Sequence, residues 1–229
     1  MAELHYLDDP VVRKVFTDVQ GVIVGESDRG AVLVGLTVVD EHLEMLLDAR
    51  PAADGRRRRA RRAADRLRIA MDEGLISRNV FDAINHLRKL RNAVAHSLVS
   101  FDLADHRDTL RRMCEIGETM PEFVSFMARK ALFDHLVEEM KDLHIEIPGE
   151  EPQRAFNSPI EVAERLAKVP GIEEKFQEKA RRLEVGLAVG FICALIGVYR
   201  LRPNGPEHPG EVISALPNQS TPANVASEE

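Results

Sequence analysis

The sequence has 229 residues, of which 44% are hydrophobic, 30% are charged and only 5% are aromatic, with no tryptophan. This balance is typical of amphipathic helices and offers little strand-forming material. The formal net charge is -7, and the two cysteines, Cys114 and Cys193, match no zinc or redox spacing, which excludes a disulfide-rich scaffold. The first ten residues carry acids and no export signal, so we expect a cytoplasmic protein.

Two helices are predicted before residue 50. Apolar residues recur every four positions in the first of them, at Val11, Val15, Val19 and Ile23. This spacing puts them on one helical face. Ser27 is the predicted N-cap of the second helix, which carries an apolar stripe as far as Leu47.

A cluster of arginines follows the second helix. Residues 50–68 hold nine arginines against two aspartates, a net charge of +7. The run at the centre consists of Arg56, Arg57, Arg58, Arg59, Arg61 and Arg62. Such a run suits phosphate groups, but it lacks interleaved aromatic residues for base stacking. We expect weak, non-specific nucleic-acid binding at most, and we favour a solvated connection that pairs with the abundant carboxylates of the same chain.

Helical patterns resume near Leu67 and continue over residues 80–98, 104–116, 121–143, 158–168 and 171–201. Residues 145–157 contain two prolines and a glycine and predict a loop. The uncharged stretch 185–199 is shorter than the roughly 20 residues of a membrane-spanning helix. We therefore expect a core helix that the other helices surround.

These patterns predict an all-α fold, a compact multi-helix bundle that forms one domain over residues 1–202. Residues 203–229 contain several prolines and few apolar side chains. Such a segment cannot bury enough apolar surface to fold, so we expect a disordered C-terminal tail.

Common enzyme motifs are absent from the sequence. It contains no GxGxxG, GxxxxGK[ST], GxSxG or HExxH segment, and no histidine has a glutamate three residues before it. Phosphate loops, hydrolase nucleophile turns and many histidine–carboxylate metal sites depend on those motifs. We expect no cofactor and no metal, and we interpret the acids around His42 and His135 as solvated helix faces.

The segment from Arg88 to Ser97 is the most informative part of the sequence. Arg91 projects within about 20° of the centre of the apolar stripe of residues 80–98, whereas Asn92 and His96 lie together toward its flank. We therefore expect Arg91 to be at least partly buried. A buried guanidinium needs an acidic partner, for which the candidates are Asp40, Glu41 and Glu44 on the second helix.

Arg91, Asn92 and His96 also resemble a known motif. Their spacing is similar to the R-x4-6-H motif of HEPN domains, which are helical modules that often act as metal-independent ribonucleases. The resemblance implies that His96 and Arg91 assist attack of an RNA 2′-hydroxyl on the adjacent phosphate across a dimer interface. Proton transfer and charge stabilisation are tasks that these two side chains can perform.

A wider resemblance is to the mannitol operon repressor (MtlR) family. It rests on residues 26–31 at the start of a long helix, Gly74-Leu75-Ile76, residues 87–96, and Ser100-Phe101-Asp102. The resembling core is about residues 11–117 plus 172–202, with a helical insertion at about 118–170. The family implies an all-α fold and a role in repressing sugar-alcohol transport genes, without a recognisable DNA-binding motif. The arginine run, the insertion and the tail depart from the family pattern.

Two functions follow from these observations. The first is a non-enzymatic regulator that acts in transcriptional control through protein–protein contacts, with Arg91 and His96 in structural roles and a homodimer as a further expectation. The alternative is an endoribonuclease of the HEPN type that uses Arg91, Asn92 and His96.

Overall fold

The fold is all-α, as predicted, apart from one very small sheet. A computed structural model describes residues 10–49, 62–97, 100–116, 120–140, 143–145, 153–156 and 158–201. Most of the predicted arginine run, residues 56–59 and 61, and the predicted tail, residues 203–229, lie outside the described residues.

The helices follow the chain in the predicted order, with ends that differ from the prediction by a few residues. Their bounds are α1 Pro10–Val24, α2 Asp28–Asp48, α3 Ala63–Asp72, α4 Arg78–His96, the 3-10 helix η3 Leu103–His106, α5 Arg107–Met113, α6 Met120–Met140, α7 Pro159–Leu166 and α8 Ile172–Leu201. The segment predicted as a loop contains a short antiparallel pair, β1 His144–Ile145 and β2 Gln153–Arg154.

Serine caps set where several helices begin. The Ser27 side chain accepts a hydrogen bond from the Gly30 amide, as its predicted role requires. Ser77 accepts one from the Val80 amide at the start of α4, and Ser158 accepts one from the Glu161 amide at the start of α7. Each bond satisfies an amide that has no partner within its helix.

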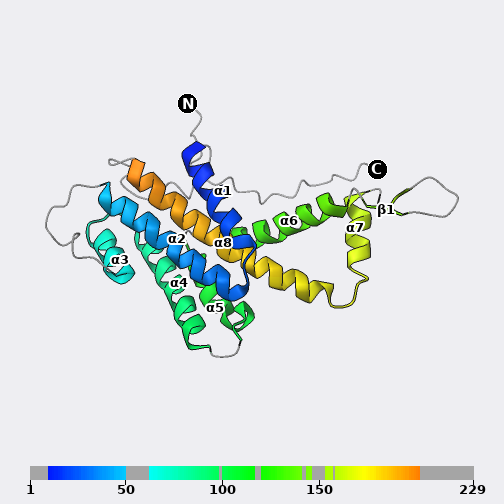
Figure 1. Ribbon diagram of the computed structural model, residues 1–229, viewed down its shortest axis with the longest axis horizontal. Coiled ribbons are helices and arrows are strands. Elements are labelled where there is room, and N and C mark those ends of the chain that lie inside the picture. The colour runs from blue at the N-terminus through cyan, green and yellow to red at the C-terminus, as the bar shows by residue number, and fades with distance from the viewer. Residues whose placement is uncertain are drawn as a thin grey trace, which may run out of the picture.

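The second half of α8 is the centre of the bundle. Every residue from Val185 to Val198 is buried, and α1, α2 and α6 pack along this helix (Figure 1). By length and composition residues 172–200 could cross a membrane, yet 78% of the apolar window is buried inside the protein. The prediction of a surrounded core helix is therefore confirmed.

Glycines allow close contacts with α8 at two places. A Cβ atom on Gly35 of α2 would lie 3.0 Å from the Val189 side chain, and one on Gly190 would lie 2.9 Å from the ring of Phe16. Contacts this short leave no room for a methyl group, so both glycines let neighbouring helices approach more closely than alanine would.

A buried ion pair joins three elements at one end of α2. The Asp28 carboxylate is 8% exposed; it accepts one hydrogen bond from Arg182 Nε of α8 at 2.6 Å and another from the Leu103 amide of η3 at 3.0 Å. Arg182 also pairs with Glu178 one turn earlier on α8. The Asp28 carboxylate and the Arg182 guanidinium therefore both have partners, as the stability of buried charges requires.

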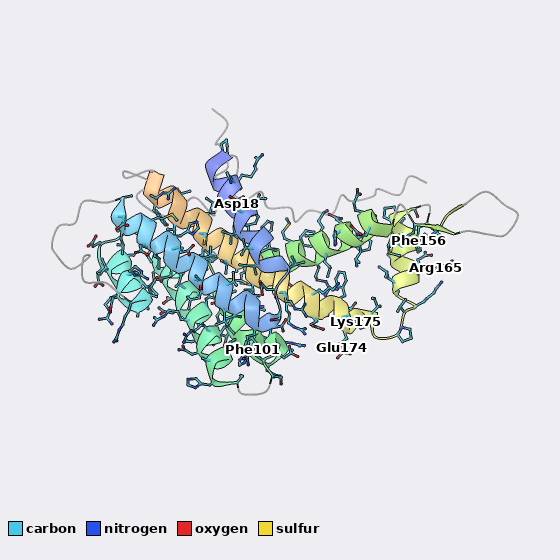
Figure 2. The ribbon with its side chains drawn as sticks, viewed as in Figure 1. Asp18, Phe101, Phe156, Arg165, Glu174 and Lys175 are labelled. Atoms are coloured by element: carbon cyan, nitrogen blue, oxygen red, sulfur yellow. The ribbon has the colours of Figure 1, made fainter. Side chains whose placement is uncertain are left out.

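Beyond the bundle, the chain forms an arm. Figure 1 shows α6 and the first half of α8 leaving the bundle together and diverging, with α7 placed between their far ends. The arm includes most of the predicted insertion. Figure 2 shows Arg165 on α7 and Lys175 near the start of α8 at its far end, well away from Phe101 beside the helices of the bundle.

Candidate functional site

The three residues of the R-x4-H segment are all exposed at the carboxyl end of α4. Each of these side chains, of Arg91, Asn92 and His96, is open to solvent. The predicted burial of Arg91 is therefore wrong. The apolar stripe of α4 was identified correctly, since Leu87, Leu90 and Val94 are buried, but Arg91 lies on the edge of that stripe and no neighbouring helix covers it.

The predicted ion pair of Arg91 with an acid on α2 is also not found. Asp40 instead receives two hydrogen bonds from Arg66 of α3, one of them from Nε at 2.9 Å. This contact raises the pKa of Arg66, with the hydrogen bond to Asp40 as the main cause. Glu41 and Glu44 are exposed.

Packing geometry explains why Asp40 meets α3. Arg29, at the start of α2, contacts Ser97, at the end of α4, so the two helices run antiparallel (Figure 1). Asp40 lies about 17 Å further along α2 than Arg29, at 1.5 Å per residue, which brings it opposite the first half of α4 and beside α3. The sequence indicates that Arg66 lies near the packed side of α3. It is adjacent to Leu67 and four residues before Ala70, both apolar and both buried.

The carboxyl end of α4 is hydrogen-bonded by Ser97 and Arg29 and not by His96. The Ser97 hydroxyl donates to the Ala93 carbonyl at 2.8 Å, and Arg29 Nη2 donates to the Ser97 carbonyl at 2.7 Å. The carbonyl groups at this helix end thus have other partners. His96 itself makes no hydrogen bond within the described part of the chain.

The exposed side of α4 is rich in positive charge. Here we call Arg88, Lys89, Arg91, Asn92 and His96 the α4 outer face. A shallow hollow of about 400 Å³ runs along the helix and includes Arg88, Lys89 and Asn92, and all of its described lining residues belong to α4. Within the hollow Arg88 donates to the Asn85 side chain at 3.0 Å, and Arg78 pairs with Asp82 at 2.9 Å.

The pKa of His86 reflects the charges near this surface. Burial lowers the pKa of His86, and the nearby cations Lys89 and Arg112 lower it further. Arg112 is on α5, which packs beside α4. Arg112 thus adds positive charge on α5 near Lys89, while Asp82 and Glu115 act on the pKa of His86 in the opposite direction. The cations suit a ligand or partner with carboxylates or phosphates.

The described part of the arginine run and the acids around His42 and His135 add little to the candidate site. Arg62, the one residue of the arginine run that the structure describes, is exposed at the start of α3 and makes no side-chain capping bond. Among the described residues, no three histidine, cysteine, aspartate or glutamate side chains gather as a metal site would require.

Comparison with known proteins gave no match to a protein-family model, to a curated protein or to a solved structure. The resemblance to the MtlR and HEPN families therefore rests on the sequence segments alone.

Proposed function

We propose that this chain is a non-enzymatic regulatory protein that binds an acidic partner protein through the α4 outer face. The observation that carries the proposal is the lack of an internal role for four exposed polar side chains. Lys89, Arg91, Asn92 and His96 make no hydrogen bond or ion pair within the described part of the chain. Since the fold does not use them, their charges and donors are available to a partner.

The shape of this surface favours a macromolecular partner. Successive residues of a helix are turned by about 100°, so Arg91 and His96 project roughly 140° apart. Two side chains that diverge in this way cannot close on one small molecule from a single helix. They can contact separate parts of a broad surface, where arginine is a frequent anchor and charge complementarity selects the partner.

The MtlR resemblance indicates the biological process in which the proposed regulator acts. It implies control of transcription through other proteins in the cytoplasm, with a homodimer as the working assembly. The positive α4 outer face is consistent with a partner that presents carboxylates, whereas the chain as a whole carries a formal charge of -7.

RNA cleavage of the HEPN type is the second candidate function. It is supported by the exposure of Arg91 and His96, which leaves His96 free to transfer a proton and Arg91 free to stabilise a phosphate. Because the two side chains diverge on one helix, cleavage would require a second copy of the chain to complete the site.

Charge reversal tests the docking proposal. The variant carries Arg88→Glu, Lys89→Glu and Arg91→Glu, and the matched control carries Arg165→Glu, Lys168→Glu and Lys175→Glu at exposed positions on and near α7. Both variants should stay folded, because all six positions are at least partly exposed.

Each tagged protein is then expressed in the native host in place of the wild type, and bound proteins are quantified together with transcript levels. We expect the α4 variant to lose a specific partner at least tenfold and to change the transcripts that the wild type controls, while the control variant behaves as wild type. Equal partner recovery and unchanged transcripts in the α4 variant would contradict the proposal.

A further inference from the structure

A second region of the molecule has the properties of a ligand site. A cleft of about 860 Å³ lies between α5, α6 and α8, where the arm leaves the bundle. Pockets for small molecules in proteins commonly have volumes of about 300–1,000 Å³. The cleft is separate from the α4 outer face, because none of the residues that line it belongs to α4.

One polar stripe of α8 forms a wall of the cleft. Glu173, Gln177, Arg181 and Glu184 follow one another at spacings of four, four and three residues and all line it. These spacings put the side chains on one face of the helix. Directly after Glu184 the helix becomes entirely buried, so the inner end of the stripe reaches the bundle core.

Ion pairs connect the walls of the cleft. Arg111 of α5 pairs with Glu122 of α6 at 2.8 Å, and Arg129 of α6 pairs with Glu173 of α8 at 3.5 Å. These pairs connect α5 with α6 and α6 with α8 at the exposed rim of the cleft. They also neutralise two of the four acids that line it, Glu122 and Glu173. The charged groups of the lining that lie outside these pairs are the acids Asp108 and Glu184 and the cations Arg107 and Arg181.

Arg181 is the unusual member of the cleft. Its side chain is only 13% exposed, and its closest carboxylate, on Asp102, is 3.8 Å from Nη2, beyond hydrogen-bond distance. The Nε atom is buried and has no hydrogen-bond partner. A buried guanidinium N–H that lacks an acceptor is costly, and such a donor is normally satisfied by water, an ion or a ligand.

A carboxyl and a hydroxyl group lie close to Arg181. Glu184 is hydrogen-bonded to Ser125 of α6, and burial raises the pKa of Glu184 even though Arg181 and Arg129 act in the opposite direction. The carboxyl oxygens of Glu184 accept hydrogen bonds, and the Ser125 hydroxyl can both donate and accept one. Together these two groups can bind a hydroxyl group of a molecule whose anionic end contacts Arg181.

We propose that the cleft between α5, α6 and α8 binds a small organic anion, with Arg181 contacting its carboxylate or phosphate, Arg107 contributing charge at the opening, and Glu184 with Ser125 binding a hydroxyl group. Arginine suits this role because its fork of donors matches the geometry of both anions.

The test is titration calorimetry of the full chain with sodium malonate and with inorganic phosphate, at constant ionic strength set with sodium chloride. Tighter binding of malonate would identify a carboxylate ligand, and tighter binding of phosphate would identify a phosphate ester. Binding should be at least tenfold weaker in Arg181→Gln and weaker by a smaller factor in Arg107→Gln, and unchanged in the control Arg165→Gln on the outside of α7.

Two further measurements keep the test independent of folding. Because Arg107 is exposed, Arg107→Gln should fold even if Arg181→Gln does not. In the wild type, the Arg181 Nε–H signal in an NMR spectrum of the arginine side chains should shift on addition of the anion that binds. Failure of both probes to bind, or equal binding by wild type and Arg181→Gln, would overturn the proposal, and neither result would bear on docking at α4.

Discussion

Cations inside the bundle and cations on the α4 outer face have opposite surroundings. Arg182 meets Asp28 and Glu178, and Arg66 meets Asp40, so each inner guanidinium joins two helices or two turns. Lys89 and Arg91 are exposed and have no such partner in the described part of the chain. A charge on an amphipathic helix therefore stabilises this fold only where packing brings an acid to it.

The largest effect is expected from breaking the inner pair at Asp28. Asp28→Ala removes the carboxylate that Arg182 and the Leu103 amide share, and it should lower the free energy of unfolding by about 3 kcal/mol. Glu178, which still binds Arg182, keeps the cost at the low end of the usual range. Urea denaturation measures it, and the exposed control Glu164→Ala should change stability by less than about 0.5 kcal/mol. Equal stabilities would mean that this pair does not hold the fold together.

A glycine pair tests how tightly the core itself is packed. Gly190→Ala on α8 puts a methyl group against the ring of Phe16 and should cost about 1–3 kcal/mol. Gly197→Ala on the same helix meets no atom within 4 Å and should be neutral or slightly stabilising. Thermal unfolding of the two variants should separate them clearly, and a destabilised Gly197→Ala would show that the last turns of α8 are packed more closely than the structure has them.

In the cleft between α5, α6 and α8, Glu184 is the group that should make stability depend on pH. Burial raises the pKa of Glu184 above the ordinary value of 4.5. A carboxyl whose pKa is higher in the folded state adds stability below the pKa of the unfolded state and loses it as the pH rises through the folded pKa.

Glu184→Gln should therefore gain stability relative to wild type as the pH is raised above about 4.5, the ordinary value for glutamate. Denaturation at a series of pH values gives the difference between the two proteins. A difference that stays constant, or that moves in favour of wild type at higher pH, would contradict the assigned direction.

The smallest effects on stability are expected on the α4 outer face. Arg91→Ala and His96→Ala should each change the free energy of unfolding by less than about 0.5 kcal/mol, because both side chains are exposed and unpaired among the described residues. Urea denaturation beside Asp28→Ala makes the comparison direct. A loss of 2 kcal/mol or more in either variant, on the order of that for a broken buried pair, would restore the structural role that the sequence predicted.

The fold was largely predictable because the signals are local. The capping serine at position 27 and the apolar stripe of α4 depend only on neighbouring residues. The uncharged second half of α8 likewise predicted a central helix, since a helix without a polar face must be covered on all sides.

The partners of charged side chains were not predictable in the same way. Periodicity shows which side of α4 is apolar, but it does not show how far along that side another helix extends, so the exposure of Arg91 was missed. The pairing of Asp40 with Arg66 depends on the antiparallel placement of α2 and α4. The cleft around Arg181 arises from the divergence of α6 and α8, which no single segment encodes.

The most direct test of the central claim is incubation of the metal-free protein with single-stranded RNA in EDTA. The claim is that the α4 outer face binds a partner and does not cut RNA. We predict that wild type, Arg91→Ala and His96→Ala all leave the RNA intact while remaining folded. Cleavage by wild type that yields 2′,3′-cyclic phosphate ends and disappears in a stably folded His96→Ala would contradict the claim and establish the ribonuclease function.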